Sequence, residues 1–130
     1  MIRIARVKGR KDFNDIDISD FHWRPKALCA GLDTARYFNQ PKGLTLEGIL
    51  DTCKECPVRQ NCLYESFLYG YDGIWGGSVP EQRNAIVRVM YEGDISDLTF
   101  EVCEDLIKVI DSIGHTKSQA LADVINILNN

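Results

Sequence analysis

Cysteine thiols are the side chains in this sequence best suited to chemistry. Cys53, Cys56 and Cys62 form a C-x2-C-x5-C array, and 23 residues separate Cys29 from Cys53. Four thiolates can bind one tetrahedral zinc ion or an iron–sulfur cube. The array therefore predicts a metal centre, and spacing alone leaves zinc and iron–sulfur open because both accept four sulfurs.

Other roles for cysteine compete with that prediction. Cysteines are often buried small hydrophobes, and C-x2-C is also a redox dithiol motif that normally lies in a βαβ context. Structural zinc sites more often pair two short C-x2-C knuckles, and this chain has one. Cys103 falls on one apolar face with Phe100, Ile107 and Ile110. We therefore expect Cys103 to be a core residue and not a ligand.

A glycine-rich pentapeptide, Gly73-Ile74-Trp75-Gly76-Gly77, follows the cysteines. Glycine permits positive φ and close approach of the backbone to a neighbouring group. The spacing predicts a turn that presents Trp75 at its surface. An ordinary turn around a core tryptophan is the alternative.

Composition indicates one globular domain. The chain has 130 residues, is 45% hydrophobic and 26% charged, and contains five cysteines. The N-terminus lacks the apolar stretch of a signal peptide, and no run of about 18 apolar residues could span a membrane. We therefore expect a cytoplasmic protein with reduced thiols, in which an odd number of cysteines favours metal ligands over disulfides.

Charge is distributed unevenly along the chain. Residues 1–11 hold five bases and no acid, namely Arg3, Arg6, Lys8, Arg10 and Lys11. Residues 78–130 hold nine acids and four bases, and the pI of about 5.1 is low for a nucleic-acid binder. We expect weak or indirect DNA contact, through the five N-terminal bases alone, unless that segment is simply a solvated tail.

Apolar periodicity and breaker residues predict an all-α fold. Helices are expected from Pro25 through Cys29, from Thr45 to Cys53, from Pro57 through Leu68, from a capping box at Ser78 to Glu81 onward, from Asp97 to Ile113, and from Thr116 or Ser118 to Leu128. The expected organisation is a flexible tail (1–20), a small cluster-organised helical domain (21–92) and an acidic C-terminal helical hairpin (94–130). A helix-turn-helix reading of the hairpin is disfavoured because its second helix offers Lys117 as its only base.

Several motifs together resemble the WhiB-like family of small transcription regulators from actinobacteria and their phages. The resemblance rests on the four cysteines, on Trp23-Arg24-x-x-Ala27-x-Cys29 leading into Tyr37-Phe38, and on the Gly73–Gly77 pentapeptide. It covers about residues 21–90. The acidic region after the tryptophan departs from the basic, DNA-touching segment that relatives usually carry.

The resemblance implies a non-enzymatic, redox-sensing regulator with a 4Fe–4S cluster that oxygen or nitric oxide degrades. Its implied ligands are Cys29, Cys53, Cys56 and Cys62. Its implied partner is region 4 of the primary sigma factor, bound as a 1:1 heterodimer. The implied contacts with sigma are Trp23, Tyr37, Phe38, Gly73, Ile74, Trp75, Gly76 and Gly77. The alternative is a zinc-structured or thiol-redox protein, of the protein disulfide reductase type, without a sigma partner.

Overall fold

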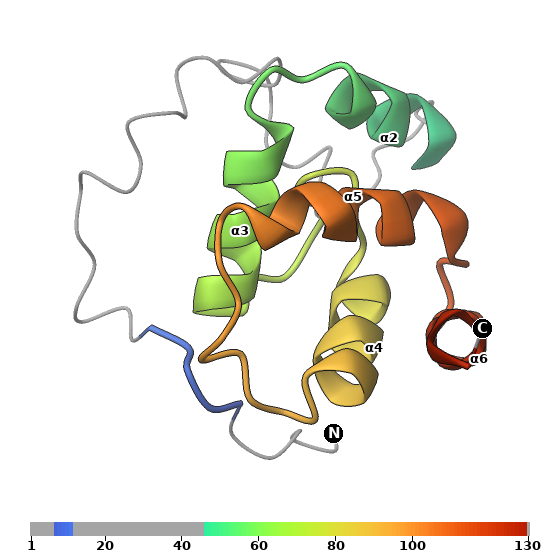
Figure 1. Ribbon diagram of the computed structural model, residues 1–130. Coiled ribbons are helices and arrows are strands. Elements are labelled where there is room, and N and C mark those ends of the chain that lie inside the picture. The colour runs from blue at the N-terminus through green and yellow to red at the C-terminus, as the bar shows by residue number, and fades with distance from the viewer. Residues whose placement is uncertain (1–6, 12–45, 130) are drawn as a thin grey trace.

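The computed structural model describes residues 7–11 and 46–129, which form five helices (Figure 1). They are α2 (Leu46–Lys54), α3 (Arg59–Tyr69), α4 (Pro80–Met90), α5 (Val102–Ser112) and α6 (Lys117–Leu128). The predicted all-α class is confirmed. The predicted helix at Pro25 to Cys29 and the predicted Thr45 cap lie outside the described residues. No helix in the described part of the chain has the length and hydropathy of a membrane span.

Helices α2 and α3 carry the cysteine array. Ile49 and Leu50 form the buried face of α2, and Glu47 and Lys54 complement the helix dipole at its two ends. Helix α3 begins two residues after the predicted Pro57. It ends at Gly70, which has a φ of 66° and donates its N–H to the Ser66 carbonyl at 3.0 Å. A left-handed glycine is the usual way to terminate a helix.

The start of α4 corrects the predicted capping box by one residue. Pro80 occupies the first turn, so Val79 is the N-cap, and Gln82 Oε1 accepts the Val79 N–H at 3.0 Å. Ser78 lies outside the helix, where its hydroxyl donates to the Trp75 carbonyl at 2.6 Å. The predicted Ser78–Glu81 pair is therefore wrong, because proline at the first helical position fixes which residues cap the helix.

Helix α5 begins at Val102, five residues later than predicted. Ile95 and Leu98 are buried in the preceding turns, and the Thr99 hydroxyl accepts the Val102 N–H at 3.2 Å. Helix α6 begins at the predicted Thr116 cap, whose hydroxyl accepts the Gln119 N–H at 3.2 Å.

One main core joins α3 to α6. Helix α4 packs on α6 and α3 packs on α5, and their buried side chains include Leu63, Phe67, Ile86, Leu106 and Val124. The C-terminal helices are therefore packed against the helices that flank the tryptophan turn. A second, smaller cluster joins Ile49 and Leu50 of α2 to Ile74 and Val79, with Cys53 packed against it.

The N-terminal segment 7–11 pairs with this core. Val7 is buried, the Lys8 N–H donates to the Gly93 carbonyl at 2.9 Å, and the Ile95 N–H donates to the Lys8 carbonyl at 2.8 Å. The Lys11 N–H reaches the Leu68 carbonyl at 2.8 Å. The segment thus bridges the end of α3 and the turn after α4, and it is the blue segment in Figure 1.

Candidate functional site

The cysteine array runs from the last turn of α2 to the first turn of α3. Cys53 lies in α2, Cys56 in the following turn and Cys62 in α3. The Cys56 N–H donates to the Cys53 carbonyl at 3.1 Å, and the Arg59 N–H donates to the Cys56 carbonyl at 3.2 Å. Two consecutive tight turns therefore connect the helices, with Cys53 just before the connection, Cys56 within it and Cys62 in the first turn of the helix that follows.

The glycine pentapeptide forms a tight turn at Trp75–Ser78. The N–H groups of Trp75 and Ser78 donate to each other's carbonyls at 3.1 and 2.9 Å. Both central residues, Gly76 and Gly77, have positive φ, 58° and 73°. This is the pattern of a type I′ turn, which glycine adopts at no steric cost. The prediction of a turn that requires glycine is confirmed.

The turn contacts the cysteine helix directly. The Gly76 N–H donates to the Cys62 sulfur at 3.1 Å. A Cβ atom at Gly76 would lie 2.7 Å from the Leu63 Cβ and 2.9 Å from its backbone nitrogen, so only glycine fits against α3 there. Ile74 belongs to the smaller cluster, against which Cys53 packs. The turn that bears Trp75 therefore touches Cys62, and the residue before Trp75 shares an apolar cluster with Cys53.

A buried arginine, Arg83, holds the turn from within. It donates to the carbonyls of Ser78 at 2.7 Å, Tyr71 at 3.0 Å and Gly73 at 2.7 Å. Burial lowers the pKa of Arg83 to about 10, and the electrostatic interaction with Cys62 is the largest opposing effect. Arg83 therefore stays protonated at neutral pH and places a positive charge near the Cys62 sulfur.

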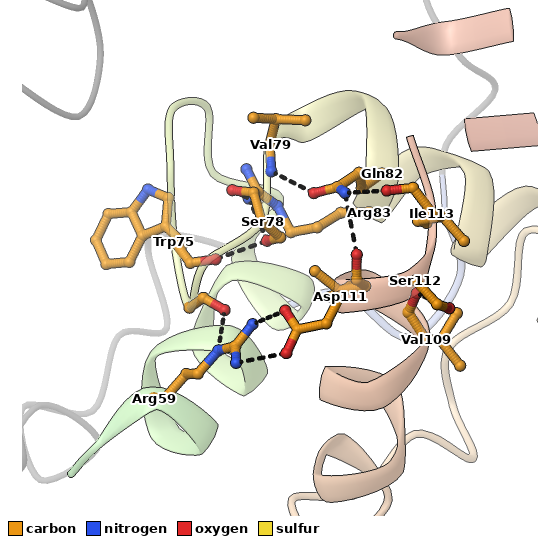
Figure 2. A network of polar contacts seen from close by, with 12 residues as sticks. Arg59, Trp75, Ser78, Val79, Gln82, Arg83, Val109, Asp111, Ser112 and Ile113 are labelled. Carbon is orange, nitrogen blue, oxygen red and sulfur yellow. Dashed lines mark hydrogen bonds and ion pairs between the residues drawn. The ribbon is translucent and has the colours of Figure 1, made fainter. Parts of the chain in front are cut away.

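A second buried arginine, Arg59, contacts the other side of the turn (Figure 2). Its Nε donates to the Gly76 carbonyl at 2.9 Å, and its two terminal nitrogens bind the Asp111 carboxylate of α5 at 3.0 and 2.5 Å. Gln82 Nε2 donates to the carbonyls of Ile110 and Ile113 at 3.2 and 3.1 Å. Sequence reasoning missed these residues. Only Gln82 had a local signal, as the third residue of a proline-started helix.

The tryptophan side chain belongs to an aromatic series. The Trp75 ring centroid lies 4.5 Å from that of Tyr71, which stacks on Tyr69 at 5.6 Å. The Trp75 Nε1–H donates to the Asp72 carbonyl at 2.7 Å. Trp75 is half-buried, and Tyr71 beside it is also partly exposed. The indole is thus held in a fixed orientation with part of its surface in solvent.

The three described array cysteines provide three of the sulfur ligands that an iron–sulfur cluster requires. One of these thiols accepts a backbone N–H, and such hydrogen bonds to sulfur are common at cluster ligands. Within residues 7–11 and 46–129, no three His, Cys, Asp or Glu side chains come together as ligands of a single metal ion. The predicted fourth ligand, Cys29, and the predicted contacts Trp23, Tyr37 and Phe38 lie outside the described residues.

The remaining candidate residues fall in two groups. Lys8 and Lys11 are exposed, whereas Arg10 is half-buried, donates to the Phe67 carbonyl at 3.4 Å and has a pKa lowered by burial. Arg3 and Arg6 lie outside the described residues. Cys103 is fully buried in the main core, as predicted, and burial raises its pKa to about 12.

Comparison with known proteins identifies the family. The family profile described as "Transcription factor WhiB" matches residues 23–86. Transcriptional regulator WhiB2 of Bifidobacterium longum is 35% identical over 72 residues, covering 53% of this chain and 70% of the relative. WhiB2 of Mycobacterium tuberculosis is 35% identical over 69 residues, covering 51% and 74%, and WhiB4 of Mycobacterium marinum is 31% identical over 68 residues, covering 52% and 57%.

No solved structure matches the chain significantly. The matched segment contains all four cysteines of the predicted centre and the whole tryptophan turn. Helices α5 and α6 lie beyond it. The coverage of the WhiB2 relatives and the profile match agree with the resemblance seen in the sequence, and the chain belongs to the WhiB family of transcription regulators.

Proposed function

We propose that this regulator acts by binding region 4 of the primary sigma factor through the tryptophan turn beside a 4Fe–4S cluster. The observation that carries the proposal is the hydrogen bond from the Gly76 N–H to the Cys62 sulfur. It ties a rigid turn, with a partly exposed indole, to a member of the cysteine array. Rigid tryptophans at the centre of an interface commonly dominate binding energy.

Cys29, Cys53, Cys56 and Cys62 would hold the cluster. When bound, it would supply a redox-sensitive structural centre. The chain's own residues fix the surface around it: Arg83 and Arg59 hold the turn from two sides, and Gly76 lets the turn lie against α3. The proposed role is regulatory and non-enzymatic, with interference or redirection of promoter recognition as its outcome.

The acidic composition of the C-terminal region favours a protein partner over DNA. Glu92, Asp97, Glu101, Glu104 and Asp105 are exposed carboxylates after α4. Phosphates would repel such a surface, whereas complementary basic surface on a protein would attract it. Any direct DNA contact would then be weak and salt-sensitive.

Anaerobic purification with and without sigma region 4 tests the proposal. The expected protein is brown, holds about four irons and four sulfides per chain, and forms a 1:1 complex with the sigma domain. Colourless protein with one zinc and no sigma binding would favour the alternative, a zinc-structured or thiol-redox protein. If the protein holds an iron–sulfur cluster but does not bind region 4, the proposed cofactor is supported and the proposed partner is rejected.

A further inference from the structure

Two buried polar side chains connect the family-matched region to α5, which lies beyond it. Arg59 binds the Asp111 carboxylate through both terminal nitrogens, at 3.0 and 2.5 Å. Gln82 donates to the carbonyl of Ile110, in the last turn of the helix, and to that of the C-cap residue Ile113. The α5 C-terminal end is therefore fixed to α3 and α4 by directed hydrogen bonds as well as by apolar packing.

The same guanidinium also supports the tryptophan turn. Arg59 Nε donates to the Gly76 carbonyl at 2.9 Å. A Cβ atom on Gly77 would lie 2.7 Å from Arg59 Nη2, so the turn lies directly on the guanidinium. Figure 2 shows Arg59 between the turn and Asp111, with all three of its nitrogens engaged.

We propose that Asp111 is a positioning residue for Trp75, acting through Arg59. The side chain of Arg59 is 9% exposed, and a buried guanidinium requires an anionic partner. Without the carboxylate, the guanidinium gains by turning toward water, and it then gives up the Gly76 carbonyl. Helix α5 thus braces the turn, a role for the region beyond the family match.

Hydrogen exchange in the full-length protein tests this inference. In Asp111→Asn, the peptide covering residues 72–79 should exchange about tenfold faster, since the paired amides of Trp75 and Ser78 lose their support. The segment around Ile95, whose N–H is bonded to the Lys8 carbonyl at 2.8 Å, should exchange at the wild-type rate. A local effect of this kind separates positioning from general loss of stability.

Asp105→Asn is the matched control. It makes the same charge change on α5, but the Asp105 side chain is 80% exposed and its ion pair with Lys108 is long, at 3.9 Å. It should leave both segments unchanged. Asp111→Glu retains a carboxylate and should restore most of the protection at residues 72–79.

Equal acceleration throughout the chain in Asp111→Asn would overturn the inference, as would unchanged exchange at residues 72–79. An equal effect of Asp105→Asn would also overturn it, because charge alone would then explain the result. The exchange readout involves no sigma factor, so its failure leaves the proposed partner untouched. Conversely, a failure to bind sigma factor would not affect the inference that α5 supports the tryptophan turn.

Discussion

The Gly76 N–H donates a hydrogen bond to the Cys62 sulfur at 3.1 Å, and this contact joins the tryptophan turn to the cysteine array. Hydrogen bonds to ligand sulfurs tune the potential of iron–sulfur groups. Because of the same contact, a chemical change at the Cys62 sulfur would alter a hydrogen bond of the turn.

Substitution of the array cysteines should remove iron without unfolding the main core. Cys53→Ser, Cys56→Ser, Cys62→Ser and Cys29→Ser should each lose the iron absorbance. Because the main core of α3 to α6 contains none of the three described array cysteines, hydrogen exchange should accelerate mostly in α2 and its small cluster.

Cys103→Ala is the control for the cysteine series. The Cys103 side chain is fully buried in the main core, so the variant should keep its iron and lose about 1–2 kcal/mol of unfolding free energy. Iron loss in Cys103→Ala, with iron retained in Cys62→Ser, would reverse the ligand assignment.

Gly76→Ala should be more damaging than a glycine substitution elsewhere. It combines a φ of 58° with a Cβ 2.7 Å from Leu63, and should cost about 3 kcal/mol in urea unfolding. Gly93→Ala also has positive φ, 81°, but meets nothing within 4 Å, so it should cost only about 1 kcal/mol. Equal costs would show that the turn does not press on α3.

Alkaline pH should destabilise the protein through Cys103. Burial raises its folded-state pKa to about 12 from an ordinary value of 9.0, so folding favours the protonated thiol. Its contribution is fully present below about pH 9 and is lost as pH rises toward 12. The urea midpoint of unfolding should therefore decrease more between pH 7 and pH 10 in wild type than in Cys103→Ala. Parallel decreases in both proteins would reject this linkage.

Much of the fold followed from local patterns. The glycine pentapeptide indicated a turn, and Thr116 indicated a helix start, and the structure confirms both. The Arg59–Asp111 pair had no such signal, because its partners are 52 residues apart and meet only when α3 packs on α5.

The late start of α5 was missed for a related reason. Leu98 lies four residues before Val102, at helical spacing, yet it is buried from an irregular turn that packs on the main core. Periodicity reports which side chains are apolar at helical spacing, and cannot separate a helix from turns that bury the same residues.

Within residues 7–11, the exposed side chains of Lys8 and Lys11 should make any weak contact of this segment with DNA. Lys8→Gln with Lys11→Gln should weaken binding to duplex DNA and reduce its salt dependence by roughly one to two released counterions. Arg10→Gln should act mainly on stability, because Arg10 donates to the Phe67 carbonyl. Fluorescence anisotropy at several salt concentrations measures the slope, and an unchanged slope in the double variant would place the contact elsewhere.

The affinity of the iron-loaded protein for sigma region 4, compared between wild type and Trp75→Ala, is the most direct test of the proposed function. Loss of the indole should weaken binding by roughly 2 kcal/mol or more, about thirtyfold, while iron content is unchanged. Leu128→Ala is the control, since this side chain is 50% exposed at the end of α6 and its truncation should leave affinity unchanged. Wild-type affinity in Trp75→Ala with iron retained would contradict the proposed interface.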